Sequence, residues 1–176
     1  IRITVERGST EMQVDRLRAR EVDALVVDVR RVIPSPDLVI ERLLELRGGF
    51  VCRATHPLAH AQGLDIDAVL RYPVATTPLA PEVGAALVEC YGAQAHPDRM
   101  AALRCENIDS LIATVEATDA VYFGVIGAAR EGLRAGRLVE LDMVRPLSLP
   151  ARFGYVTLAG RTEAPVMQVL RRFVAE

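Results

Sequence analysis

The sequence predicts an α/β fold built around a parallel, doubly wound sheet, and three observations lead to this prediction. Short apolar segments, typical of buried strands, alternate along the chain with segments whose apolar residues recur at helical spacing. Glycine and proline residues separate these segments at short intervals, as they do at the ends of helices and strands. Residues 103–127 contain a strand, a helix and a second strand in succession, which is the repeating unit of parallel sheets.

The composition is that of an ordinary globular protein. The 176 residues are 51% hydrophobic and 25% charged, which is enough for one large domain or two small ones. The formal net charge of −2 is too low for the chain to hold a nucleic-acid backbone by itself. No apolar run approaches the roughly 20 residues that a membrane-spanning helix needs, so no membrane partner is expected.

The cysteines and the N-terminus indicate a cytoplasmic protein. Cys52, Cys90 and Cys105 are odd in number and far apart, so neither a disulfide framework nor a metal site is expected. Reduced, mostly buried thiols are typical of the cytoplasm. No signal peptide opens the chain, and because Ile1 is not a natural start we expect an N-terminal part of the protein to precede it.

The first third of the chain predicts a strand, a short helix and a second strand. Residues 1–6 alternate between apolar and polar side chains, as a half-buried strand does. Thr10 and Gln13 have the spacing of a capping box, which predicts that a helix starts there. Residues 24–29 form an apolar strand, and Arg30 follows at its carboxyl end.

The middle of the chain begins with extended segments. Residues 39–46 and 50–54 read as two extended pieces separated by Gly48 and Gly49, and His56 is expected to anchor the turn that follows. Asp65 is the predicted cap of a short helix. Residues 74–77 predict a strand, and a helix over residues 81–91 follows it.

The central stretch and the C-terminal part complete the alternation. Asn107 is a good N-cap for a helix with one apolar face, and residues 120–126 are the apolar strand that follows. Residues 138–141 and 153–158 predict two more strands, and Thr162 is the expected cap of a last helix.

Polar side chains gather where the predicted parallel strands end. Ligands bind in open α/β sheets at the carboxyl ends of strands, beside helix N-termini. Thr76 and Thr77 end one strand and Asn107 precedes a helix, so we expect all three to contact a ligand, with Asp109 a weaker candidate that suits an amine or hydroxyl. The alternative for each is a structural role: capping of a turn or helix, or, for Asp109, complementing the helix dipole.

No pattern of a catalytic site is present. The sequence contains neither a G-x-S-x-G nucleophile elbow nor a G-x-G-x-x-G or P-loop phosphate motif. Glu106 and Asp109 are the only carboxylate pair that invites a catalytic interpretation, and Asp109 more simply complements the helix dipole. We therefore expect no catalytic residues, cofactor or metal.

Four landmarks give the sequence a resemblance to the effector-binding domain of LysR-type transcriptional regulators. They are the strand–helix–strand run over residues 5–26, the His-Pro-Leu-Ala segment at 56–59, the central stretch 107–126, and Gly-Arg-Leu-Val at 136–139 before a return strand and terminal helix. Each is weak alone, but their order and spacing cover nearly all of the chain. The turn after the central helix departs from the family, because Thr118 and Ala120 replace its two glycines.

The resemblance implies two Rossmann-like lobes of the type 2 periplasmic-binding-protein kind. Residues 1–54 and 142–176 would form lobe I, which lacks the family's first strand and helix, and residues 55–141 would form lobe II. Residues 51–54 and 141–147 would be the hinge, and a small effector would bind between the lobes. Arg53, on the outgoing hinge strand, is the best candidate to pair with an effector carboxylate, and Arg30 is a weaker addition. The alternative for Arg53 is a solvent-facing strand arginine.

The same resemblance implies the partners. The family acts as antiparallel dimers, and as tetramers at full length, and it binds DNA through a helix-turn-helix domain that these residues do not contain. A ligand-sensing domain of a bacterial transcription factor is therefore the leading hypothesis. A solute-binding protein of a transport system shares the fold and is the alternative, and an α/β enzyme is a third possibility.

Overall fold

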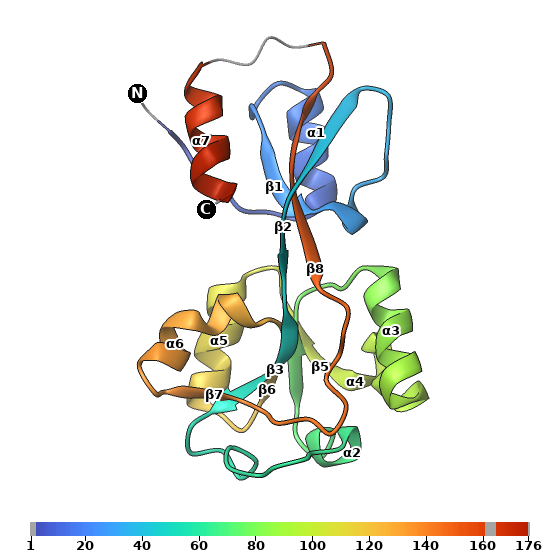
Figure 1. Ribbon diagram of the computed structural model, residues 1–176, viewed down its shortest axis with the longest axis vertical. Coiled ribbons are helices and arrows are strands. Elements are labelled where there is room, and N and C mark those ends of the chain that lie inside the picture. The colour runs from blue at the N-terminus through green and yellow to red at the C-terminus, as the bar shows by residue number, and fades with distance from the viewer. Residues whose placement is uncertain (1–2, 161–164, 176) are drawn as a thin grey trace. The chain divides into compact units, whose positions relative to one another are not determined.

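The computed structural model describes residues 3–160 and 165–175 and divides the chain into two compact units (Figure 1). Unit 1 comprises Ile1–Glu45 and Ala151–Glu176, and unit 2 comprises Leu46–Pro150. The polypeptide therefore passes between the units twice, as it leaves strand β2 (Leu38–Leu46) and as it enters strand β8 (Ala151–Leu158).

Unit 1 is a small α/β unit. Its elements are α1 (Thr10–Arg18), β1 (Leu25–Asp28), the 3₁₀ turn η1 (Val29–Arg31), β2 (Leu38–Leu46), β8 (Ala151–Leu158) and α7 (Pro165–Ala175). The three strands form a sheet in the order β1-β8-β2, in which β1 runs antiparallel to β8. Leu17 of α1 is fully buried in the core of this unit.

Unit 2 contains a five-stranded mixed sheet in the order β5-β4-β6-β3-β7. Its strands are β3 (Gly48–Arg53), β4 (Val74–Thr76), β5 (Ala101–Arg104), β6 (Val121–Val125) and β7 (Leu138–Glu140). Strand β4 lies parallel to both β5 and β6, whereas β3 lies antiparallel to β6 and β7. The parallel part agrees with the prediction from sequence, and β3 and β7 make the sheet mixed.

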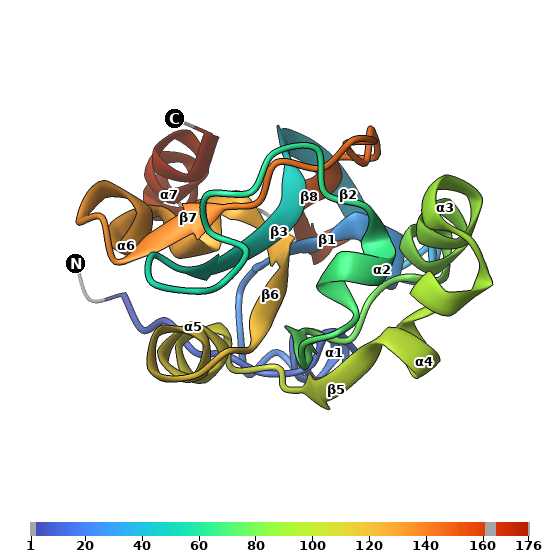
Figure 2. The same ribbon diagram turned by 90° about the horizontal axis from the view of Figure 1, so that it is seen from below.

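Helices cover both faces of this sheet, as Figure 2 shows. On one face lie α2 (Ile66–Val69), α3 (Pro81–Tyr91), the turn η2 (Ala93–Ala95) and α4 (Pro97–Met100), and on the other lie α5 (Ile108–Ala117), η3 (Ile126–Ala129) and α6 (Arg130–Arg134). Successive strand residues face opposite sides, so Phe50 and Cys52 enter the first core while Val51 enters the second. Burial raises the pKa of the Cys52 thiol to about 11, which keeps it protonated at neutral pH.

The helix starts largely follow the capping residues of the sequence. Asn107 and Asp65 cap α5 and α2 as predicted, each accepting a hydrogen bond from a backbone N–H in the first turn. Helix α1 differs, because its N-cap is Ser9 rather than Thr10, and the Ser9 hydroxyl accepts from the Met12 amide at 3.3 Å. Gln13 lies in the first turn and is buried.

Two elements predicted from the sequence are not observed as predicted. Residues 3–9 have no regular secondary structure and pair with no described strand, and Val5 is 81% exposed. An alternating segment becomes a strand only when a neighbour supplies backbone hydrogen bonds, so the alternation of residues 1–6 was not sufficient. Thr162, the predicted cap of the last helix, lies outside the described residues.

The unit boundaries lie away from the predicted lobe boundaries 54/55 and 141/142. Strand β3 pairs with β6 and β7 and so belongs to unit 2 from its first residue. Leu147 and Leu149 pack against the core of the same unit, which places the second boundary after Pro150. The helices of the described residues include none long and apolar enough to cross a membrane.

Candidate ligand-binding site

The parallel strands of unit 2 end together at one edge of the sheet. In the strand register Thr76 lies opposite Arg104 of β5 and Phe123 of β6. The residues that follow these positions therefore share an edge, which we call the carboxyl edge: Thr77 after β4, residues 105–107 after β5, and the turn after β6. This is the position at which open α/β sheets bind ligands.

Thr76 and Thr77 form one part of the carboxyl edge. The Thr76 side chain is completely buried, and its hydroxyl donates to the Thr77 carbonyl at 3.2 Å. The Cys105 amide donates to the Thr76 carbonyl at 3.2 Å, which joins the ends of β4 and β5. Thr76 therefore has a structural role, because its hydrogen bonds fix the ends of β4 and β5. Thr77 is partly exposed and is accessible to a ligand.

Asn107 forms the second part, at the start of α5. Its side-chain oxygen accepts from the Ser110 amide at 3.1 Å, which leaves its two amide N–H groups as the donors that Asn107 offers a ligand. The Asn107 backbone amide donates to the Cys105 sulfur at 3.3 Å. Asp109 lies exposed in the first turn, where a carboxylate complements the positive end of the helix dipole.

Arg53 is not at this edge. Because β3 runs antiparallel to β6, its last residue lies at the amino-terminal edge of the sheet, about 10 Å from the level of Thr76 by strand rise. There Arg53 donates to the Asp119 carboxylate through Nε at 3.1 Å and Nη2 at 2.7 Å, and to the Thr55 hydroxyl. Arg53 and the carboxyl-edge residues therefore lie at opposite ends of this sheet, and Arg53 pairs with a carboxylate of its own unit.

Arg30 belongs to unit 1, just past the end of β1. Its Nε and Nη2 donate to the two carboxylate oxygens of Asp28, at 2.9 and 2.5 Å, and its side chain is only 10% exposed. Nη1 is buried without a hydrogen-bond partner among the described residues. Arg30 is therefore a constrained, largely inaccessible cation.

The sequence interpretation missed the position of two further residues. Cys105 packs against the second core of unit 2 and is partly exposed, and its sulfur accepts from the Asn107 amide at the start of α5. Tyr122 of β6 is buried with its hydroxyl hydrogen-bonded to the backbone of Val125, at the end of the strand. The predicted Asn107 cap indicated that Cys105 lies near the start of α5. The position of the Tyr122 hydroxyl depends on tertiary packing, which no local sequence pattern predicts.

The part of the chain that the structure describes holds no group of three histidine, cysteine or carboxylate side chains able to bind a metal ion. What the carboxyl edge offers is hydroxyl, amide and backbone N–H donors at the start of a ten-residue helix. Such donors suit the oxygen atoms of a small polar molecule or anion.

Comparison with known proteins agrees with this description. The model of the LysR substrate binding domain family matches residues 1–176. The SDS degradation transcriptional activation protein of Pseudomonas sp. (strain ATCC 19151) is 29% identical over 164 residues, which is 92% of this chain and 52% of that protein. The chain thus spans about half the length of this curated relative.

Solved structures share the fold. HinK, a LysR family transcriptional regulator from Pseudomonas aeruginosa, aligns at a TM-score of 0.70 and 14% identity over 96% of this chain and 56% of HinK. The effector binding domain of QuiR, solved in complex with shikimate, aligns at 0.67 and 15% over 96% of this chain and 77% of that one. At these identities the likeness shows the fold alone.

The family match favours the regulator hypothesis over the transport alternative, because the model and the curated relative both describe regulator proteins. With the mixed α/β sheet of unit 2 and the match over all 176 residues, the chain belongs to the family of LysR substrate-binding domains.

Proposed function

We propose that the chain is the ligand-sensing domain of a LysR-type transcriptional regulator, and that the carboxyl edge of unit 2 binds its effector. The observation that carries the proposal is the convergence of Thr77 and Asn107 at this edge, joined by the hydrogen bond from Cys105 to Thr76. The name of the Pseudomonas relative, a transcriptional activation protein, supports the regulatory role.

The proposed effector is a small molecule with a carboxylate or a similar oxygen-rich group. The first turn of α5 directs its backbone N–H groups and the positive end of the helix dipole toward its N-terminal side. Asn107 adds two amide donors and Thr77 a hydroxyl. Structures of similar fold hold small molecules, shikimate in QuiR and 2-PG in CcmR of Synechocystis PCC6803, which supports a small polar ligand here.

The proposed mechanism is a shift between conformations of the regulator. An effector changes this equilibrium only by its difference in affinity for the two states. We propose that the change passes through a homodimer, within a tetramer in the full-length protein, to a DNA-binding domain outside these residues. The protein is proposed to be cytoplasmic, without catalytic activity.

The test is a thermal-shift screen of small carboxylates and amino acids against wild type and Thr77→Val, which removes only the hydroxyl. A ligand at 100 times its Kd stabilises the folded chain by about 2.7 kcal/mol, which is easily detected. We expect a carboxylate that stabilises wild type clearly and Thr77→Val much less. A panel without any stabilising compound, or a compound that stabilises both proteins equally, would contradict the proposed site.

A further inference from the structure

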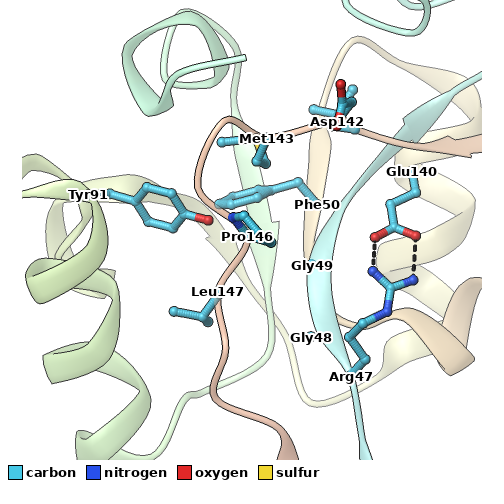
Figure 3. A pocket seen from close by; sticks show the side chains of 11 residues that line it. Arg47, Gly48, Gly49, Phe50, Tyr91, Glu140, Asp142, Met143, Pro146 and Leu147 are labelled. Atoms are coloured by element: carbon cyan, nitrogen blue, oxygen red, sulfur yellow. Dashed lines mark hydrogen bonds and ion pairs between the residues drawn. The ribbon is translucent and has the colours of Figure 1, made fainter. Parts of the chain in front are cut away.

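Unit 2 contains a hollow of about 200 Å³, open to solvent, whose lining does not include Thr76, Thr77 or Asn107 (Figure 3). It lies between the first half of β3, the end of α3 and the segment that follows β7. Figure 3 shows the ion pair of Arg47 and Glu140 on one side of the β3 backbone and the side chains of Phe50, Tyr91 and Leu147 on the other.

The hollow exists because β7 covers only half of β3. Strand β7 pairs with the last three residues of β3, and the Leu141 amide then donates to the Phe50 carbonyl at 2.9 Å. Beyond this point the chain turns toward Leu64, which donates to the Asp142 carbonyl at 2.8 Å and accepts from the Val144 amide at 3.0 Å. The outer edge of β3 at Gly48 is left uncovered.

The backbone of Gly48 faces the hollow. The Ile126 amide donates to the Arg47 carbonyl at 3.0 Å, and Gly48 lies opposite Val125 in the register. Arg47 therefore directs its backbone groups to β6, and since direction alternates along a strand, Gly48 directs its N–H and C=O to the open side. In the described residues, no hydrogen bond joins Gly48 to the segment after β7.

The lack of a side chain at Gly48 keeps the space open. A Cβ built at Gly48 would have the Gly124 carbonyl oxygen, at 3.7 Å, as its only neighbour within 4 Å. The partly buried Tyr91 and Leu147 form the apolar wall, and the buried Phe50 ring lies behind it, 6.1 Å from the Tyr91 ring. The Tyr91 hydroxyl is occupied because it donates to the Arg145 carbonyl at 2.6 Å. Apart from the charged side chains of the lining, the hydrogen-bonding groups that the hollow offers are thus backbone groups.

The charges of the lining disfavour an anion. The lining contains one arginine, Arg47, and two carboxylates, of which the first is Glu140. Arg47 already donates two hydrogen bonds to Glu140, with Nη2 2.7 Å from Oε2. The second carboxylate, Asp142, accepts from the Gly63 amide at 3.0 Å. A ligand carboxylate would meet two like charges and a cation that has its partner.

We propose that this hollow is a second small-molecule site, which binds an uncharged carboxamide or lactam with an aromatic or aliphatic body. The ligand carbonyl would accept from the Gly48 N–H, its N–H would donate to the Gly48 carbonyl, and its body would lie against Tyr91 and Leu147. A syn amide presents one donor beside one acceptor, which matches the pair that a single strand residue offers. Its lining residues differ from Thr77 and Asn107, which form the proposed effector site.

Benzamide, benzoate and benzamidine test the chemistry, because they share one ring and differ in charge. Each is titrated into the ¹⁵N-labelled chain, and the amide resonances of Gly48, Tyr91 and Leu147 report on the hollow while Thr77 and Asn107 report on the carboxyl edge. We expect saturable shifts at the first three residues with benzamide, and affinity lower by about tenfold or more for benzoate. Equal binding of the two compounds, or benzamide shifts confined to Thr77 and Asn107, would overturn the proposal.

Variants at Gly48 test the location. Gly48→Leu fills the hollow and should weaken benzamide binding by about tenfold or more, and Gly48→Ala, for which the structure has room, should weaken it by about threefold. Gly127→Ala is the matched control, because its Cβ would also meet only one neighbour, at 3.8 Å, and it should bind like wild type. If folded Gly48→Leu binds benzamide like wild type, the proposal fails; if Gly48→Leu does not fold, the affinity of Gly48→Ala decides.

Discussion

Arg53, Asp119 and His56 form a small cluster at the amino-terminal edge of the unit 2 sheet. The Asp119 carboxylate accepts from Arg53, and its backbone carbonyl accepts from Nε2 of the buried His56 at 3.2 Å. Nδ1 of His56 in turn accepts from the Leu58 amide at 3.0 Å, which confirms that this histidine anchors a turn. The cluster joins the end of β3 to the start of β6, so we assign Arg53 a structural role.

Arg53→Ala should therefore change stability and not ligand binding. The ion pair is partly exposed, so we expect a loss of about 1 kcal/mol in the free energy of unfolding, measured by urea denaturation. Arg137→Ala, which breaks the comparable pair with Glu116, is the control and should cost a similar amount. An effector whose affinity falls tenfold in Arg53→Ala alone would restore Arg53 to the binding site.

Tyr122 gives unit 2 a predictable response to alkaline pH. Burial raises the pKa of Tyr122 to about 12, whereas an unfolded tyrosine titrates near about 10. Above pH 10 the unfolded chain loses this proton and the folded chain keeps it, so the stability from Tyr122 is present below about pH 10 and is lost as the pH rises toward 12. The loss should approach about 2–3 kcal/mol at the upper limit.

Tyr122→Phe tests this expectation. The variant should lose about 1 kcal/mol at neutral pH, because the hydrogen bond to the Val125 backbone is gone. Its stability should then fall less steeply than that of wild type between about pH 10 and 11 in urea denaturation. Parallel pH profiles for the two proteins would show that Tyr122 does not carry the alkaline transition.

At the scale of elements, α5 combines a structural cap with a proposed ligand contact. The Asn107 oxygen caps the helix, and the Asn107 amide N–H groups are the proposed donors to the effector. Because the two functions use different atoms of one side chain, substitutions can separate them.

Asn107→Asp should keep the cap and lose the ligand. The carboxylate still accepts from the Ser110 amide, so stability should stay within about 0.5 kcal/mol, while affinity for a carboxylate effector should fall about tenfold or more because the donors are replaced by a like charge. Asn107→Ala should lose both, with a stability cost of about 1 kcal/mol. Asp65→Ala, which removes the cap of α2, is the control and should lose stability alone.

Strand direction explains how much of the site could be predicted from the sequence. The apolar runs and caps located β4, β6, α3 and α5, and with them Thr76, Thr77 and Asn107 at one edge. The sequence predicted Arg53 on an extended hinge segment, but no local pattern shows whether such a strand pairs parallel or antiparallel. The antiparallel pairing of β3 with β6 places Arg53 at the other edge. The edge of β3 at Gly48 is uncovered because Asp142 and Val144 form backbone hydrogen bonds with Leu64 instead. These contacts join distant parts of the sequence, so no local pattern predicted them.

At the scale of the whole molecule, the chain consists of two α/β units connected by two segments of polypeptide. Four landmarks spread over the sequence already implied membership of the LysR substrate-binding domain family. The implication depended on their order and spacing along the chain, because each landmark is weak alone. The partners remain proposals.

The proposed partners predict two solution properties of the chain. With a net charge of −2 and no DNA-binding domain in these residues, it should not retard promoter DNA in a gel-shift assay. In sedimentation equilibrium it should form a dimer of about 38 kDa, twice the chain mass of 19.2 kDa. Specific DNA retention, or a strictly monomeric chain at high micromolar concentration, would contradict these proposals.

The measurement that tests the central claim most directly is NMR mapping of the best stabilising carboxylate on the ¹⁵N-labelled chain. If the effector binds at the carboxyl edge, the amide resonances of Thr77, Cys105, Asn107 and Ser110 should shift with a common Kd, and those of Arg53 and His56 should not. Saturable shifts centred on Arg53 and Asp119, with Thr77 and Asn107 unchanged, would contradict the account.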